Sequence, residues 1–300
     1  MKVLVVGGTG MLGHKLAHVL GAEAEMRVHA TVRRPPAPEF SAPGVRYHTG
    51  VDLSGGTGPL AAVLREVAPD VVVNAVGAIK QKDLYAAVDQ AFFLNGSLPH
   101  LLALLNPNPG ARVIHFSTDC VFRGDRGAYT EADESDALDL YGRSKAVGEV
   151  GYGPHLTLRT SAVGWEAGDP RLGLLSWFLG HERGAQVRGF TRAVFSGLPA
   201  VTLARTVLRL VRDFPELRGV YHAASEPIDK YHLLSRVNEA LGLGYRLVPD
   251  PSLAIDRSLD DARFRAATGT VRPGWDALVD ELVDDLDALP YRALYRAFAA

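Results

Sequence analysis

The sequence predicts an α/β fold in which a doubly wound parallel sheet is followed by a smaller, irregular α/β lobe. Short apolar runs that fit buried strands alternate with helical patterns, a glycine-rich turn follows the first run, and the alternation loosens after about residue 160. Strands that alternate with helices form βαβ units, whose parallel sheet is covered on both faces. A chain of 300 residues is long enough for such a sheet and a second lobe.

The expected elements follow in order along the chain. Strands are predicted at 3–6, 28–32, 45–48, 71–74, 112–117 and 156–161, and helices at 11–20, 60–67, 86–105, 139–150, 200–213, 229–241 and 275–288. The proline-rich segment PPAPEFSAPG after the second strand predicts an exposed loop.

Composition and charge exclude several classes of protein. The formal charge of -2 argues against a nucleic-acid-binding protein, and no apolar run approaches the ~18 residues that span a bilayer. A single cysteine cannot form an intrachain disulfide, which fits a reducing compartment. We therefore expect a cytoplasmic protein without a membrane partner.

The stretch VLVVGGTGMLG places Gly7, Gly10 and Gly13 at three-residue spacing between the first strand and the first helix. Glycines at such a turn let the backbone approach a diphosphate, which the N-terminus of the helix then stabilises. The motif predicts a dinucleotide site at residues of this turn: Gly7, Thr9, Gly10, Met11 and Leu12.

Residues at the ends of the next strands indicate which dinucleotide binds. Arg33 and Arg34 follow the second strand, where an acidic residue suits the ribose 2′-hydroxyl of NAD and an arginine suits the 2′-phosphate of NADP. The two arginines favour NADP over NAD. Asp52 is a candidate adenine contact, with Leu53 beside it. The residues at the end of the fourth strand are also assigned to the cofactor: Asn74, Ala75 and Val76.

The sequence YGRSK puts Tyr141 and Lys145 four residues apart, on one face of a helix. A nearby ammonium group can lower the pKa of a phenol from its reference value near 10 toward neutrality. Ser117 and Thr118 end a strand upstream. Together these residues supply a hydroxyl to orient a carbonyl, a phenol to move its proton and a lysine to tune the phenol.

These motifs resemble those of the extended short-chain dehydrogenase/reductases, and among them the dTDP-4-dehydrorhamnose reductases. The resemblance rests on GGTGMLG, on STDCVFRGDRGAYTEADESDALDLYGRSKAVGE (117–149) and on LRTSAVG (158–164). It implies a Rossmann-type sheet and NADPH-dependent reduction of a 4-keto nucleotide sugar for polysaccharide biosynthesis. Thr118 would orient the sugar, Tyr141 would donate the proton, and Lys145 would hold the nicotinamide ribose. Asn95 would support the lysine through water.

The same expectations divide the chain into two parts. Residues 1–165 would form the dinucleotide-binding domain, with segments of about 187–224 returning to it. The rest of 166–300 would mainly form the substrate-binding lobe. The resemblance leaves a homodimer open as the assembly, and we assign no residue to a metal site.

The substrate site departs from the resembling reductases. Lys80 and Lys82 fall in a loop near the expected nicotinamide end, where they could meet a sugar diphosphate or be solvated loop charges. Arg188 is a further candidate substrate contact. The later Gln-x-Gly-x-Pro-Thr signature of these reductases is not evident. The nucleotide base and the sugar are therefore open.

Two other functions compete with simple reduction. Related GDP-fucose synthases have a cysteine two residues after their catalytic serine, and Thr118 and Cys120 reproduce that spacing. A thiol there could epimerise a keto sugar with a histidine partner, for which His181 is the candidate. A cysteine after a buried strand is also commonly a small hydrophobic residue. The third alternative is a non-catalytic, NADP-binding regulatory subunit.

Overall fold

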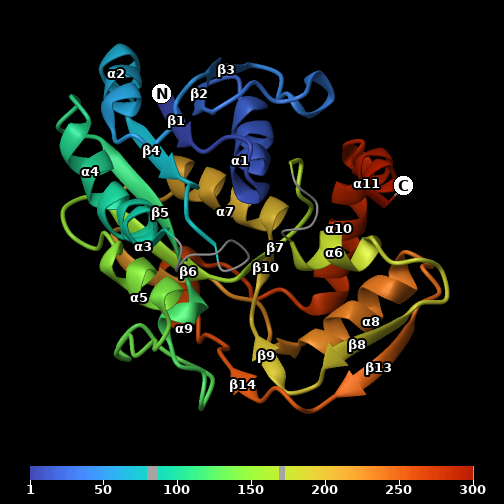
Figure 1. Cartoon of the computed structure of the whole chain (residues 1–300). Coiled ribbons are helices and arrows are strands. Elements are labelled where there is room, and N and C mark those ends of the chain that lie inside the picture. Colours follow the sequence, from blue (N-terminus) through green and yellow to red (C-terminus); the bar gives the residue numbers. More distant parts are fainter. Residues whose placement is uncertain (80–86, 169–172, 300) are drawn as a thin grey trace.

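The computed structural model describes residues 1–79, 87–168 and 173–299. A seven-stranded parallel sheet forms its centre, in the order β11-β6-β5-β4-β1-β2-β3 (Figure 1). The strands are β1 (Lys2–Val6), β2 (Arg27–Thr31), β3 (Val45–His48), β4 (Val71–Asn74), β5 (Arg112–Thr118), β6 (Leu156–Thr160) and β11 (Gly219–His222). This arrangement confirms the predicted doubly wound, Rossmann-type sheet.

Strand β1 shows why these residues form the centre of the sheet. Its side chains alternate between two apolar clusters, one containing Val3 and Val5 and the other Leu4 and Val6, and all four residues are fully buried. β-branched residues suit a strand that is covered on both faces. The strand order reverses between β1 and β4, where Val6 pairs with Asn74. Ligands of open α/β sheets bind beyond the strand ends at such a point.

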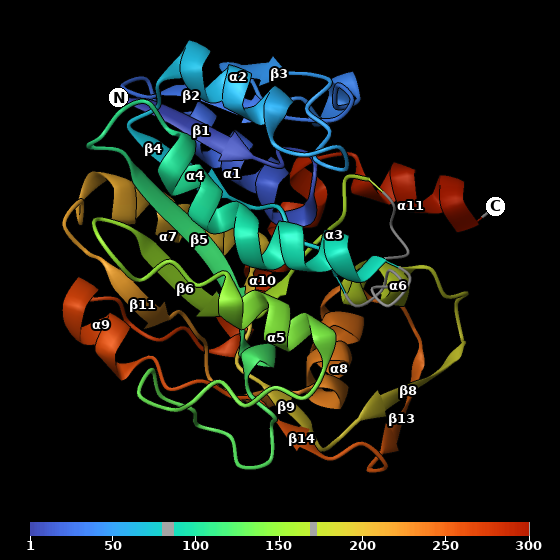
Figure 2. The ribbon, with the colours of Figure 1, turned by 60° about the vertical axis from the view of Figure 1, so that its left-hand side comes forward.

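Helices cover the two faces of this sheet (Figure 2). Helices α1 (Met11–Gly21) and α7 (Ala200–Arg212) pack against each other and share the cluster of Val3 and Val5. Helices α2 (Gly58–Val67) and α4 (Leu98–Leu105) belong to the cluster of Leu4 and Val6. Helix α5 (Leu140–Val147) packs beside β5.

The predicted continuous helix at 86–105 is wrong in one respect. It is divided into α3 (Val88–Phe92), a π-helical turn η3 (Phe93–Ser97) and α4. Pro99 has no N–H to donate to the carbonyl of Asn95 four residues earlier, so a regular α-helical hydrogen bond cannot form there. The π turn accommodates this loss and leaves Asn95 fully buried.

The C-terminal part is an irregular α/β lobe beside the sheet (Figure 1). Its strands are β7 (Ala162–Val163), β8 (Gln186–Phe190), β9 (Ala193–Phe195), β10 (Leu198–Pro199), β12 (Ile228–Asp229), β13 (Arg246–Asp250) and β14 (Ile255–Asp256). Its helices are α6 (Leu174–Leu179), α8 (Lys230–Ala240), α9 (Ala262–Thr268), α10 (Trp275–Ala288) and α11 (Tyr291–Ala299). Short 3₁₀ turns lie at η1 (Pro38–Phe40) and η4 (Asp119–Val121).

The chain returns to the central sheet after this lobe has begun. Helix α7 packs on α1, and β11 pairs with β6 at the edge of the sheet. Strand β8 instead pairs with β13, and β9 pairs with β12 and β14, so both lie in the small sheets of the lobe. No helix among the described residues is long and apolar enough to cross a bilayer.

Candidate active site

The glycine turn after β1 uses each glycine differently. Gly7 has a φ of +91°, and a Cβ atom on it would lie 2.6 Å from Val76 Cγ2. A Cβ atom on Gly13 would lie 1.9 Å from the carbonyl oxygen of Gly7, so both positions require glycine for packing. Gly10, at the start of α1, is exposed and has room for a Cβ atom. The turn therefore presents open backbone at a helix N-terminus, which fits a diphosphate.

The residues predicted to contact the adenosine part meet beyond β2. Arg33 and Arg34 are exposed immediately after β2, and the N–H of Gly50 donates to the carbonyl of Arg33 at 3.2 Å. Hydrogen bonds from Ser54 hold the pKa of Asp52 below its ordinary value, and the charge of Arg33 lowers this pKa further. The Arg33 cation and the Asp52 carboxylate are thus neighbours at this edge, while the predicted neighbour Leu53 is buried.

Thr118 and Tyr141 come together from two different elements. Thr118 ends β5, and Tyr141 lies in the first turn of α5, which Asp139 caps by accepting the N–H of Gly142 at 2.7 Å. The hydroxyl groups of Thr118 and Tyr141 are hydrogen-bonded. Two residues that lie 23 positions apart in the chain therefore form one hydroxyl pair.

The surroundings of this pair fix the directions of its hydrogen bonds. Thr118 Oγ1 donates to Asp119 Oδ1 at 3.0 Å and accepts the N–H of Cys120 at 3.1 Å. Burial raises the pKa of Tyr141, and the neighbouring Cys120 and Asp119 raise it further against the opposing effect of Thr118. The direction is opposite to the lowering that the Tyr-x-x-x-Lys spacing predicts, because burial disfavours the phenolate.

Lys145 lies one helical turn after Tyr141 on α5 and contacts β5. Its ammonium nitrogen is 2.5 Å from the carbonyl oxygen of Phe116 and 3.3 Å from His115 Nε2. Burial lowers the pKa of Lys145 to about 8, and Glu149 opposes that shift. Lys145 is thus a buried amine that can gain or lose a proton near neutral pH.

The two predicted asparagines connect the end of β4 with α5. Asn74 is fully buried, with its Oδ1 accepting the N–H of Val76 at 3.1 Å. Asn95 Oδ1 accepts the N–H of Ala78 at 2.8 Å, and its Nδ2 donates to Ser144 Oγ at 3.0 Å. In this structure Asn95 therefore binds the loop after β4 and α5 directly. Ala75 follows Asn74 and donates its N–H to the carbonyl of Val6.

Cys120 faces the site and not the apolar core. It is half-buried, and its Sγ lies 3.6 Å from Nη1 of Arg257. It lies close enough to Tyr141 and Lys230 to affect the pKa of each. The interpretation of Cys120 as small core filler does not describe this environment.

The other substrate candidates are distributed differently. Lys80 and Lys82 lie outside the described residues. Arg188 lies on β8, where its Nε donates to Asp250 of β13 at 2.9 Å. His181 follows α6 and contacts the carbonyl of Phe178 through its Nδ1 at 3.1 Å.

Lys230 is a functional candidate that the sequence motifs did not indicate. Its ammonium group lies 3.3 Å from the centroid of the Phe195 ring. Burial lowers the pKa of Lys230 to about 8, while Asp119 and Cys120 oppose the shift. One signal was available: lysine opens helix α8 directly after the capping residue Asp229, where the helix dipole disfavours a cation. Asp119 and Arg257 are two further candidates that the sequence analysis did not assign to the site.

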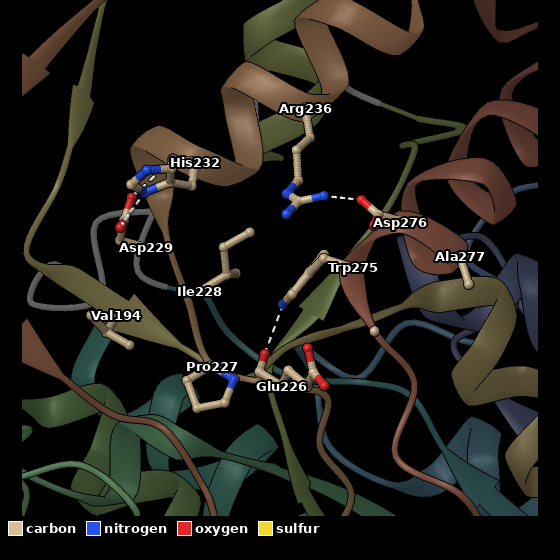
Figure 3. Close-up of a pocket in the computed structure, with 11 residues that line it drawn as sticks. Val194, Glu226, Pro227, Ile228, Asp229, His232, Arg236, Trp275, Asp276 and Ala277 are labelled. Carbon is tan, nitrogen blue, oxygen red and sulfur yellow. Dashed lines mark hydrogen bonds and ion pairs between the residues drawn. The ribbon is translucent and has the colours of Figure 1, made fainter.

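A cavity of about 640 Å³ lies in the C-terminal lobe, between the first turns of α8 and α10 (Figure 3). Four of its polar side chains form two pairs, His232 with Asp229 and Arg236 with Asp276. Its lining residues are Val194, Glu226, Pro227, Ile228, Asp229, His232, Arg236, Gly274, Trp275, Asp276 and Ala277. None of the hydroxyl pair, Lys145 or the glycine turn lines this cavity.

Comparisons with known proteins agree with this fold. A dTDP-4-dehydrorhamnose reductase of Shigella flexneri is 26% identical over 95% of this chain and 98% of its own length. The enzyme of the same name from Burkholderia thailandensis is 31% identical, and that match spans about half of each chain, 54% of this one and 50% of the relative. The crystal structure of dTDP-4-dehydrorhamnose reductase from Bacillus anthracis in complex with NADP has a TM-score of 0.74 at 19% identity, over 94% of this chain and 98% of that chain.

The pattern that defines the RmlD substrate-binding domain matches residues 1–287. The resemblance to dTDP-4-dehydrorhamnose reductases that the motifs indicate is therefore confirmed at the level of the family. The chain belongs to the RmlD substrate-binding domain family.

Proposed function

We propose that the protein is an NADPH-dependent oxidoreductase that reduces the 4-keto group of a nucleotide sugar. The observation that carries the proposal is the hydrogen-bonded pair of Thr118 and Tyr141, which lies at the same sheet edge as the glycine turn. The relative from Shigella flexneri, which spans nearly the whole chain, is named a dTDP-4-dehydrorhamnose reductase. These two facts support a sugar carbonyl as the reacting group.

The described residues fit an NADP cofactor. The open backbone at Gly10 and the N-terminus of α1 would hold the diphosphate, and Arg33 and Arg34 would hold the 2′-phosphate. Bound NADPH supplies the hydride. Asp52 and Lys145 would contact the adenosine and the nicotinamide ribose.

Tyr141 is suited to act as the proton donor. Because burial raises its pKa, the phenol stays protonated at neutral pH and can give its proton to the alkoxide that hydride addition creates. Thr118 donates its own proton to Asp119, so its oxygen remains an acceptor toward Tyr141. This arrangement orients the phenol before the substrate arrives.

The same geometry supports a division of the chain into two parts. We propose that 1–165, joined by α7 and β11 from within 187–224, holds the cofactor, and that the rest of 166–300 mainly holds the sugar nucleotide. Lys230 and Arg257 belong to this second part and reach Asp119 and Cys120. The substrate would then lie between the two parts.

Oxidation of NADPH with a panel of 4-keto nucleotide sugars tests the proposal. We expect turnover with at least one of them and a loss of about 10²-fold or more in kcat for Tyr141→Phe, with NADPH affinity preserved. Thr118→Ala should show a similar loss. Tight NADPH binding without turnover on any of these sugars would support a non-catalytic regulatory subunit instead.

The placement of Cys120 favours one second candidate, an epimerase/reductase. The thiol lies beside Tyr141 and Arg257, where it could exchange a proton at a carbon next to the ketone. Turnover in deuterated water decides the matter. Deuterium at a ring carbon of the product, lost in Cys120→Ser, supports epimerisation, whereas an unlabelled product excludes it.

A further inference from the structure

Three buried polar side chains, Asn74, His115 and Lys145, contact one another in series. Asn74 Nδ2 lies 3.1 Å from His115 Nδ1, and His115 Nε2 lies 3.3 Å from Lys145 Nζ. Asn74 and His115 are fully buried, and Lys145 is 5% exposed. The polar atoms of these three side chains therefore depend on protein partners for their hydrogen bonds.

The orientation of the Asn74 amide is fixed by the backbone. The N–H of Val76 points at Asn74 Oδ1 at 3.1 Å. Because a backbone N–H can only donate, the atom that it meets must be the amide oxygen. The amide NH₂ group then faces His115 Nδ1, and it too can only donate. His115 Nδ1 is therefore an acceptor and carries no proton.

This assignment determines the tautomer of His115. Burial holds the pKa of His115 well below its ordinary value, and a charged Lys145 would lower it further, so the ring is neutral at pH 7. Its single proton must then lie on Nε2, which points at Lys145 Nζ. An ammonium group would oppose this N–H with another N–H. A neutral amine accepts it and still donates to the carbonyl of Phe116 at 2.5 Å.

Other charged groups around Lys145 only partly offset this preference. Glu149, on the same helix, favours the ammonium form, but its carboxylate already accepts two hydrogen bonds from Arg159 at 2.8 Å each. Tyr141, one turn earlier, is a neutral phenol at pH 7 because its pKa is raised. A charge on His100, from α4, would lower the pKa of His115. The backbone of Gly77 also lies near Lys145, since a Cβ atom on it would be 4.0 Å from Lys145 Nζ, but it carries no charge.

We propose that Asn74 and His115 are positioning residues that favour the neutral amine form of Lys145 over its ammonium form in the free protein, and that Lys145 takes up a proton from solvent when cofactor hydroxyl groups become its acceptors. The first half concerns the free protein alone. The second half rests on the proposed function. The proton binds to the amine lone pair, and no other bond changes.

Titration of the lysine side chains in the cofactor-free protein tests the first half. The chain has six lysines, so ¹⁵N-labelled side chains give few signals, and Lys145→Arg identifies the one of interest. We expect a midpoint near pH 8 in the wild type and a rise of about one pH unit in His115→Leu, because the opposing N–H is removed. An unchanged midpoint in His115→Leu would overturn the proposal.

His14→Leu is the matched control. His14 is also buried, at 2% exposed, and it lies on α1, where it contacts Gly10 and Tyr291. Its replacement should leave the Lys145 midpoint unchanged. A rise of equal size in both variants would mean that a general loosening of the fold, and not the His115 N–H, controls Lys145.

The role of Asn74 has a test of its own. Its first arm, Asn74→Asp in the otherwise wild-type protein, does not depend on the folding of His115→Leu, and an unchanged Lys145 midpoint there would overturn this part of the proposal. In Asn74→Asp the introduced carboxylate accepts both the N–H of Val76 and a proton on His115 Nδ1, which leaves Nε2 free to accept from an ammonium group. Asn74→Asp should therefore raise the Lys145 midpoint more in the wild type than in the His115→Leu background. Equal rises would reflect charge alone and would overturn this part of the proposal.

Calorimetry of NADPH binding tests the second half. Binding at pH 8.5, measured in two buffers of different ionisation enthalpy, gives the number of protons taken up. We expect more than about half a proton for the wild type, since the Lys145 pKa is about 8, and clearly less for His115→Leu. NADPH binding without proton uptake would overturn this half. A failure to bind NADPH would instead contradict the proposed function and leave the lysine titration standing.

Discussion

Gly142 and Cys120 bring helix α5 into direct backbone contact with the turn after β5. A Cβ atom on Gly142 would lie 2.1 Å from the carbonyl oxygen of Cys120. Because Tyr141 precedes this glycine and Thr118 precedes the turn, the close approach sets the distance between the two hydroxyl groups. The candidate active-site pair therefore depends on a residue without a side chain.

Gly142→Ala should separate this pair. The new methyl group meets a backbone atom that cannot rotate away, so we expect kcat to fall by about tenfold or more and the free energy of unfolding to fall by about 1–3 kcal/mol. Gly58→Ala, at the start of α2, is the control because nothing lies within 4 Å of its Cβ position. Equal losses of kcat and of stability in Gly142→Ala and Gly58→Ala would contradict the role of the contact between Gly142 and Cys120.

Two glycines of the turn after β1 should have different roles, Gly13 in packing and Gly10 in cofactor binding. Gly13→Ala should lower the Tm markedly, since its methyl group would overlap the carbonyl oxygen of Gly7. Gly10→Ala should leave the Tm nearly unchanged and weaken NADPH binding by about tenfold, because the methyl group occupies the space through which the diphosphate approaches. Thermal unfolding and fluorescence titration with NADPH measure the two effects. Preserved affinity in Gly10→Ala would place the diphosphate elsewhere.

Arg33 and Arg34 should decide between the two nicotinamide cofactors. Replacing both with alanine removes charge-assisted hydrogen bonds to the 2′-phosphate, so we expect NADPH affinity to fall by about ten- to a hundredfold and NADH affinity to change little. Arg27→Ala is the control, because this exposed arginine begins β2 at its opposite end. Equal losses for NADPH and NADH would show that the arginines do not read the 2′-phosphate.

Stability should decrease below neutral pH because of buried histidines. His14 is 2% exposed, contacts Tyr291 and accepts no proton until its pKa of about 3, since burial and Lys15 disfavour the charged ring. The unfolded chain takes up this proton near pH 6.5, so the free energy of unfolding falls as the pH drops from about 6.5 toward 3.

Each such histidine contributes a slope of up to about 1.4 kcal/mol per pH unit in that range. His14→Gln should reduce the slope by one histidine's share, even if it lowers stability at pH 7. Urea unfolding at pH 7.0 and pH 5.5 provides the comparison. A slope equal to that of the wild type would show that His14 does not contribute.

The sequence pattern was sufficient to predict the structure where one strong physical requirement acts on residues that are neighbours in the chain. The strand at 71–74 is apolar because both of its faces are covered, and a glycine turn is visible because only glycine tolerates its geometry. The Thr118–Tyr141 pair was predicted because its two halves lie in recognisable motifs. Strands of only two residues, such as β12 and β14, carry no periodicity and could not be predicted.

Contacts between residues far apart in the sequence could not be predicted either. The partners of Lys145 depend on which atoms of β5 lie beneath α5, and spacing along the chain does not reveal them. Lys230 reaches Asp119 only because α8 folds back from the C-terminal lobe. The predicted lowering of the Tyr141 pKa failed for the same reason, since burial depends on the whole fold.

The π turn at Phe93–Ser97 amounts to one residue inserted into an otherwise continuous helix. Removing one residue from this stretch would take away the wide turn itself, while the helices on either side could keep the faces that they bury. Asn95, which lies within the turn, would lose the position from which it bonds Ala78 and Ser144. A single-codon deletion here would therefore disconnect the loop after β4 from α5, whereas the surface turns of the chain can change length without touching that link.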